Sequence, residues 1–300
     1  MGNPAPDTYK VSATYGDGYR CMGVCTVVGP KAVEKAHRVA EAILSRTRRI
    51  FQKTGLPDFT QTHVHVVGSG SSYIHGADSG DSREVCMWLG VRHTHKQALG
   101  IFSRELAPAG TGMAPGFTSL IGGRPSVSPV LRLFSFLYPK NKLPVSIHLN
   151  GELVKTLDYS GCGTGIASQL EDEREGEGCA RGDCIYRLEQ LAYLRSGDKG
   201  NSANIGVIAR HPDFLPYIRR ALTTDVIRNY FGHFLEDTST IERYELPGIR
   251  ALNFVIGDCL GGGGVASLRI DPQGKAYAQM LAEYELIGLP EFPSEHLQKN

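Results

Sequence analysis

The stretch that decides the fold of the C-terminal half is residues 195–206, RSGDKGNSANIG, which separates an apolar run ending at Leu194 from another beginning at Ile205. Its glycines allow positive φ angles, and charged, hydroxyl and amide side chains lie beside one another. A second glycine-rich stretch, residues 257–264 with the sequence GDCLGGGG, follows a strand-like run. We predict that the two stretches are loops that form the walls of one site. The alternative is that each is a hairpin or bulge whose glycines serve only the backbone.

Composition narrows the classes of protein. With 300 residues, 41% hydrophobic and 21% charged, the chain is long enough for two domains. The net charge of +1 provides no overall field for nucleic acid or an anionic membrane. No apolar run approaches the roughly 20 residues that span a bilayer, and no leader pattern opens the chain. We therefore expect a cytoplasmic protein that binds neither nucleic acid nor membrane. Seven scattered cysteines favour reduced thiols.

The first half predicts an α+β domain, residues 1–158. Its apolar patterns predict two strand–strand–helix units, a further strand and a hairpin. The turn signals are Gly16-Asp17-Gly18 in a first hairpin over residues 10–28, and Asn150-Gly151 in the last. Between them we expect a helix from Pro30, strands 62–67 and 84–93, a helix after Thr94, and a strand over 130–138.

The second half predicts another sheet-and-helix domain, residues 185–290, reached through a flexible acidic and glycine-rich linker, residues 159–184. Residues 291–300 are expected to be a tail. The domain's expected strands are 185–194, 205–209, 241–246, 249–256 and 265–270. One helix is expected to begin near Thr224. A last helix is expected after Pro272 and through Ile287.

Familiar cofactor signatures are lacking, so we expect no cofactor. The stretch GSGSSY at residues 68–73 lacks the third glycine of a dinucleotide fingerprint, and Lys199 lacks the spacing of a Walker A motif. No Gly-x-Ser-x-Gly elbow is present. If strands 62–67 and 84–93 pair, His63, His65 and His93 could approach one another. We expect surface histidines and no metal, with a metal-dependent hydrolase as a third hypothesis.

A resemblance rests on residues 193–210, YLRSGDKGNSANIGVIAR, with Ala251-Leu252-Asn253-Phe254 and the glycines 261–264. These residues resemble the C-terminal ferredoxin-fold domain of the AtuA family, the acyclic terpene utilisation proteins. In the first half, residues 4–12 and 17–19 look like the later part of the family's main domain. The resemblance implies catabolism of acyclic isoprenoids such as citronellol and geraniol, through branched acyl-CoA thioesters.

The loop residues fit such a ligand. We assign Lys199 as the cation for a phosphate or thioester-linked carboxylate, and Asp198 or Asp258 as general base. Glycine N–H groups would form an anion nest or oxyanion donors. The ligand-binding candidates are the small and amide residues of both loops: Ser196, Gly197, Gly200, Asn201, Asn204, Gly261, Gly262 and Gly263.

The resemblance also implies a partner question. Members of the family usually carry a large α/β segment before the region that Pro4 and Pro6 open here, so we expect a C-terminal portion, a truncated gene product or a reduced homologue. Expected partners are a small-molecule substrate such as an acyl-CoA, a second copy of the chain, or a chain that supplies the missing segment. The alternative function is a non-catalytic ligand-binding or complex-assembly module.

Overall fold

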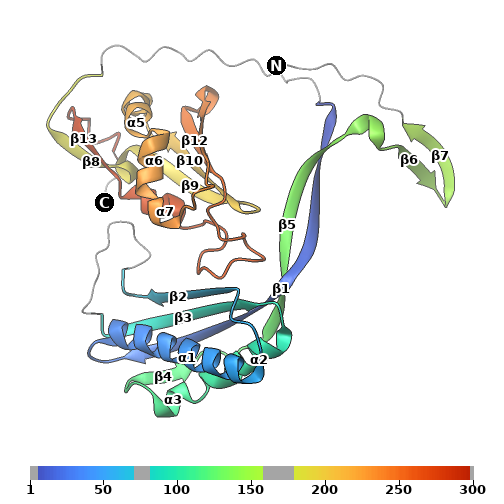
Figure 1. Cartoon of the computed structure of the whole chain (residues 1–300). Coiled ribbons are helices and arrows are strands. Elements are labelled where there is room, and N and C mark those ends of the chain that lie inside the picture. The colour runs from blue at the N-terminus through green and yellow to red at the C-terminus, as the bar shows by residue number, and fades with distance from the viewer. Residues whose placement is uncertain (1–5, 71–81, 158–178, 298–300) are drawn as a thin grey trace. The chain divides into compact units, whose positions relative to one another are not determined.

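A computed structural model describes residues 6–70, 82–157 and 179–297 (Figure 1). The chain divides into two compact units, one of Met1–Tyr15 and Leu133–Glu177 and one of Gly16–Arg132 and Gly178–Asn300. Two long strands, β1 (Thr8–Val28) and β5 (Val127–Pro139), contribute residues to both units. The mixture of sheets and helices confirms the predicted α+β class.

The N-terminal part of the larger unit is a sheet with strand order β2-β3-β1-β4, and β5 pairs with β1. Its elements follow in the chain as β1, α1 (Ala32–Thr54), β2 (Gln61–Val67), β3 (Glu84–His93), α2 (Lys96–Leu106), α3 (Ala109–Gly112) and β4 (Phe117–Leu120). The printed pairings among β1 to β4 are antiparallel. This order is the split β-α-β-β-α-β arrangement of ferredoxin-like folds.

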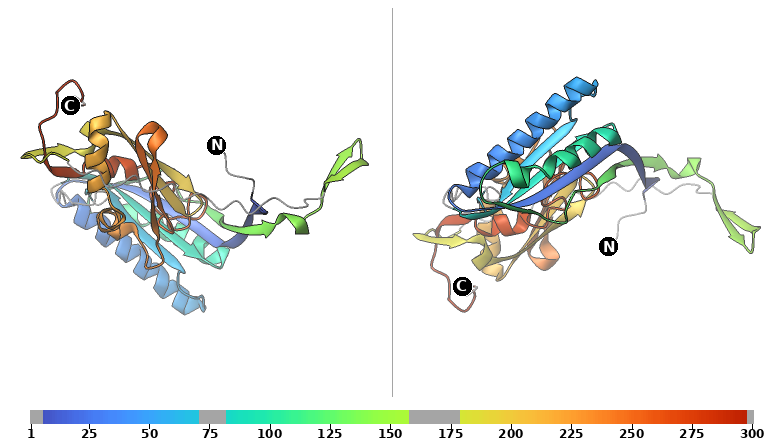
Figure 2. Two further views of the ribbon diagram at one scale, coloured as in Figure 1. Left: turned by 90° about the horizontal axis from the view of Figure 1, so that it is seen from above. Right: turned by 90° about the horizontal axis from the view of Figure 1, so that it is seen from below.

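Both long helices cover one face of that sheet (Figure 2). The apolar stripe of α1, including Val39 and Ile43, is buried, as its helical spacing predicts, and Phe51 is buried beside it. Alternate residues of β3 face the same core, among them Met87 and Leu89. The intervening residues of β3 therefore lie on the opposite face of the sheet.

The predicted hairpin over residues 10–28 is wrong, because β1 runs unbroken through the Asp17-Gly18 dipeptide. Gly18 has a φ of 76°, and an added Cβ would lie 2.8 Å from the carbonyl oxygen of His93. The glycine thus allows a close approach to β3 within a continuing strand. Pairing with β3 from Tyr19 to Val28 overrides the local turn signal.

The C-terminal part of the larger unit contains a four-stranded antiparallel sheet with order β11-β12-β10-β9 and a two-stranded sheet of β8 and β13. Helices pack on one face of the larger sheet (Figure 1), around a core that includes Phe214, Phe231 and Phe254. The elements are β8 (Cys184–Arg187), α4 (Leu188–Leu191), β9 (Ala192–Lys199), β10 (Ser202–Ala209), α5 (Leu215–Ala221), α6 (Thr224–Tyr230), β11 (Ile241–Leu246), β12 (Ala251–Ile256), α7 (Tyr277–Ala282) and β13 (Glu285–Leu289).

Three local predictions in this part need correction. The single strand expected over residues 185–194 is interrupted by the short helix α4. Residues 265–270 form a loop instead of a strand. The last helix ends at Ala282, and Ile287 belongs to β13, where it pairs with Ile185. Pairing with a distant edge strand decides the conformation of the chain end.

The smaller unit exposes much apolar surface. Its hairpin of β6 (Val145–Leu149) and β7 (Glu152–Leu157) turns at Asn150 and Gly151, with φ of 52° and 88°, as predicted. Exposed apolar side chains on β5, β6 and β7 include Phe134, Leu137, Leu149, Leu153 and Val154.

The predicted domain boundaries, residues 1–158, 159–184, 185–290 and 291–300, remain a prediction. Residues 158–178 of the expected linker lie outside the described part of the chain. Among the helices that are described, none has the length and apolarity to cross a bilayer.

Candidate functional site

The first predicted loop is the tight turn between β9 and β10. Lys199 pairs with Ser202, so Gly200 and Asn201 alone form the turn, and Gly200 has a φ of 66°. The remaining residues of the stretch belong to the two strands. The stretch is therefore a hairpin, as the simpler alternative held, yet its tip carries the contacts that matter next.

Asn201 joins this turn to the second glycine stretch, residues 257–264, which we call the glycine loop. The Asn201 side-chain oxygen accepts a hydrogen bond of 2.6 Å from the Gly262 N–H, and its amide donates to Asp258 at 3.0 Å. The main-chain oxygen of Asn201 accepts from the N–H groups of Cys259 and Leu260, at 3.1 and 3.3 Å. The two loops therefore meet, as the sequence predicts.

The glycine loop needs its glycines at the junction. Gly261, Gly262 and Gly263 all have positive φ. A Cβ on Gly263 would lie 2.1 Å from the carbonyl oxygen of Gly200, where neither backbone can give way easily. These glycines thus permit the close approach of the two main chains.

Asp198 and Lys199 leave β9 on opposite faces of the sheet, because adjacent residues of a strand alternate. Asp198 Oδ1 lies 3.9 Å from the ammonium of Lys275, while Lys199 Nζ donates to the Asp198 carbonyl at 3.1 Å. Asp258 has a φ of 49°, and its main-chain oxygen accepts from Ser239. Within the described residues, no hydrogen bond or ion pair joins Lys199 to Asp258.

Lys275 is the lysine that sequence reasoning missed. Asp271 holds the turn before it, accepting from the N–H groups of Lys275 and Ala276 at 2.9 and 2.8 Å. The Ser196 hydroxyl donates to the Lys275 carbonyl and accepts from the Ala278 N–H. The stretch DPQGK, residues 271–275, carried the signal, because an Asp-Pro followed by glycine favours a capped turn.

Two further predicted ligand-binding residues, Gly197 and Asn204, lie on the face of the C-terminal sheet away from the helices. Asn204 donates to the side chain of Asn253 at 3.3 Å, and Gly197 stands opposite Asn204 in the pairing register. A Cβ on Gly197 would lie 3.3 Å from Lys275 Nζ. Because Gly197 has no side chain, the ammonium reaches over the edge strand. This face also exposes Tyr193, Ile208, Tyr244 and Leu246.

Buried polar groups beneath the glycine loop are bonded to the main chain. The Tyr277 hydroxyl donates to the Cys259 carbonyl at 2.9 Å, and Arg269 donates to the carbonyls of Phe234 and Cys259. Burial, the largest cause, raises the pKa of Tyr277 and of the Cys259 thiol. Both side chains therefore stay protonated at neutral pH and support the loop instead of reacting.

The three histidines do not converge. The register of β2 and β3 places His63 opposite Gly90 and His65 opposite Trp88. His93 instead packs its ring against Phe51 on the helix-covered face, so the expectation of a surface histidine is wrong for this buried residue. Desolvation, followed by the fields of His65 and Arg269, lowers the pKa of His63 to about 4. Among the described residues no cluster of three or more histidine, cysteine, aspartate or glutamate side chains is arranged to hold a metal ion.

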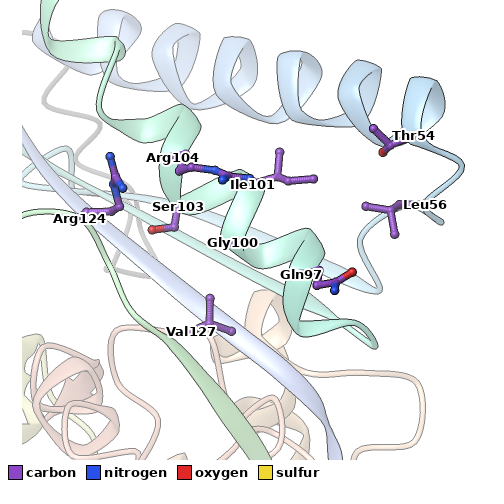
Figure 3. Close-up of a pocket in the computed structure, with 9 residues that line it drawn as sticks. All are labelled: Thr54, Leu56, Gln97, Gly100, Ile101, Ser103, Arg104, Arg124 and Val127. Carbon is purple, nitrogen blue, oxygen red and sulfur yellow. The ribbon is translucent and has the colours of Figure 1, made fainter.

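Two hollows in the structure lie away from the β9–β10 turn and the glycine loop, which together we call the loop pair. One, of about 680 Å³, is broad and open along α2, between Gln97 and Arg104 and the facing residues Thr54, Leu56 and Arg124 (Figure 3). The other, of about 270 Å³, lies at the end of β3 and is lined by Asp17, Thr60, Gln61, Arg92, His93, Thr94 and Arg132.

The fold and the loop pair define an α+β protein whose C-terminal sheet carries a glycine-rich polar junction. Comparison with protein families agrees with this. The model for the acyclic terpene utilisation family protein AtuA matches residues 1–149, and the model for the AtuA ferredoxin-like domain matches residues 186–287. The chain belongs to the AtuA family and has its C-terminal ferredoxin-like domain. Searches of the curated proteins and of the solved structures found no match.

Proposed function

We propose that the protein binds a terpenoid acid or a branched acyl-CoA in acyclic terpene utilisation, with the loop pair as its binding site. Family membership supports the pathway. The observation that carries the site is Asn201, which ties the hairpin tip to the glycine loop through both its side chain and its main chain. Such a rigid junction can hold ligand-binding groups in fixed positions.

Two cations are available beside this junction. Lys275 has a side chain 60% exposed and Lys199 is exposed, so both can reach an anion in solvent. An ammonium suits a carboxylate or a phosphate as a point charge. Asp198, 3.9 Å from Lys275, keeps the local charge balanced until an anionic ligand arrives.

The geometry favours binding over catalysis at these residues. Asp198 and Lys199 point to opposite faces of β9, and the Asp258 carboxylate accepts a hydrogen bond from Asn201. A general base must reach the proton that it removes. We therefore assign Lys199 and Lys275 to ligand binding. Asp198 and Asp258 remain candidate general bases for a substrate that contacts both carboxylates.

The test is a thermal-shift series in phosphate-free buffer with CoA, a branched acyl-CoA thioester and a terpenoid acid. A ligand that binds only the native state raises the unfolding midpoint. We expect a shift with the thioester or the acid, and a smaller shift for Lys275→Ala or Lys199→Ala. Lys142→Ala, at an exposed position in the smaller unit, is the control. Equal shifts in all three variants would place the ligand elsewhere.

A second candidate function is assembly into a complex. One row across the open face of the C-terminal sheet is apolar, formed by Leu246, Ala251, Ile208 and Tyr193 in register. Exposed apolar patches often mark interaction surfaces. Analytical ultracentrifugation of the wild type and of Tyr193→Ser tests this candidate. Assembly through this face predicts that the mass of the wild type rises with concentration and that the mass of the variant rises less.

A further inference from the structure

The hollow at the end of β3 holds two arginines around one carboxylate. Arg92 donates to Asp17 Oδ2 at 2.5 Å and to the Asp17 carbonyl at 3.2 Å. Arg132 Nε lies 3.0 Å from the same Oδ2, at ion-pair distance but without the geometry of a hydrogen bond. One negative charge thus faces two guanidinium groups, which leaves an excess of one positive charge.

Arg92 is deeply buried and incompletely bonded. Its side chain is 8% exposed, yet its Nε has no hydrogen-bond partner among the described residues. A terminal nitrogen reaches Gln61 only at 3.4 Å. A buried charged donor without a partner is costly, so its presence at the wall of a hollow needs an explanation.

The rest of the wall supplies neutral groups. His93 accepts from the His95 N–H through Nδ1, so Nε2 carries the proton and donates to the Pro57 carbonyl at 2.9 Å. These hydrogen bonds fix the tautomer of His93 and use both of its ring nitrogens, so the ring only forms part of the wall of the hollow. Thr60 and Thr94 also line the hollow, and a threonine hydroxyl is a hydrogen-bond donor.

We propose that this hollow binds a small oxyanion, which the guanidinium groups of Arg92 and Arg132 at its wall hold and share with Asp17. The planar, five-donor guanidinium suits carboxylate and phosphate oxygens equally. A volume of about 270 Å³ accommodates inorganic phosphate or the carboxylate end of a short acid. The site is independent of the loop pair, because the two share no residue.

The experiment is isothermal titration calorimetry of the whole chain with sodium phosphate and, separately, with sodium acetate, at an ionic strength fixed with chloride. We expect saturable binding of at least one anion. Comparison of the phosphate and acetate titrations identifies which class of anion binds, and a preference for either anion supports the site. No saturable heat with either anion at millimolar concentrations would overturn it.

Variants separate binding from structure. Arg132→Gln removes one charge at a side chain that is 43% exposed and should weaken binding about tenfold. Asp17→Asn removes the competing carboxylate and should tighten binding, an effect that a merely structural role would not give. Arg46→Gln and Glu105→Gln, which alter an ion pair between α1 and α2, are matched charge controls. Equal effects of the control and site variants, or no gain with Asp17→Asn, would overturn the proposal. Circular dichroism checks that each variant is folded.

Discussion

The loop pair and the end of the N-terminal sheet around Arg92 are both rich in polar groups, but the hydrogen bonding of these groups is satisfied differently in the two regions. At the loop pair, Asn201 donates and accepts within the protein, and the N–H groups of Gly262, Cys259 and Leu260 are bonded to it. At the sheet, three buried side-chain nitrogens lack hydrogen bonds to described residues: His63 Nε2, Arg92 Nε and Arg132 Nε. The first region uses its polar groups to build structure, and the second leaves donors for something else.

The difference teaches that density of polar residues in a sequence does not by itself identify a binding group. Asn201 and the glycines of residues 261–263 act first on the backbone, whereas Lys199 and Lys275 are exposed and can meet a ligand. Buried groups that the fold does not satisfy are the stronger sign of an unfilled site. Variants in each region can test this contrast.

The largest expected effect is at the loop junction. Gly263→Ala puts a Cβ against the Gly200 carbonyl at a positive φ, so we expect a loss of about 3 kcal/mol or more in the free energy of unfolding. Urea unfolding measures it. Gly248→Ala, where an added Cβ meets nothing within 4 Å, is the control and should change the free energy by less than about 1 kcal/mol. A mild Gly263→Ala variant would show that the junction is not close-packed.

Sequence patterns predicted the elements that local physics determines. The Asn150-Gly151 turn and the stripe of α1 follow from backbone and side-chain preferences within a few residues. The Asp17-Gly18 turn failed because pairing with β3 outweighs a two-residue signal. Ile287 likewise follows its partner strand β8 instead of helical periodicity.

The candidate sites show the same limit. Two glycine-rich stretches that each follow a strand could be expected to meet, and Asn201 does join them, because the turn before β10 lies at the same sheet end as the end of its antiparallel neighbour β12. Nothing near Asp198 in the chain indicates that its ion-pair partner is Lys275, because that contact depends on the open space at Gly197 and on the turn that Asp271 caps. The pairing of Asp17 with Arg92 also joins two strands, β1 and β3, that are far apart in the sequence, and no motif encodes it.

A moderate effect is expected from Asn201→Ala. The change leaves the Gly262 N–H without its side-chain acceptor and Asp258 without its donor, which should cost about 1 to 2 kcal/mol of unfolding free energy. Urea unfolding checks the value, and hydrogen exchange at Gly262 should rise specifically. Asn201→Asp, which keeps an acceptor for Gly262 but repels Asp258, should lie at or beyond the alanine value. An unchanged exchange rate would mean that the main chain alone holds the loops together.

The smallest effect at neutral pH concerns His63 in the second region. Its pKa is lowered to about 4 from 6.5, chiefly by burial, so the folded state keeps the ring neutral while the unfolded state takes up a proton below about pH 6.5. The free energy of unfolding should therefore fall as the pH drops from about 6.5 to about 4, and protonation of this group should change it little above that range.

His63→Gln should reduce this dependence of the unfolding free energy on pH. His65, whose pKa burial also lowers, should supply part of the dependence that remains. His148→Gln, at an exposed position of β6, is the matched control. An equal slope in the wild type and His63→Gln, measured by urea unfolding at each pH, would mean that the ring gains a partner or reaches solvent. The contrast between the two regions would then rest on Arg92 and Arg132.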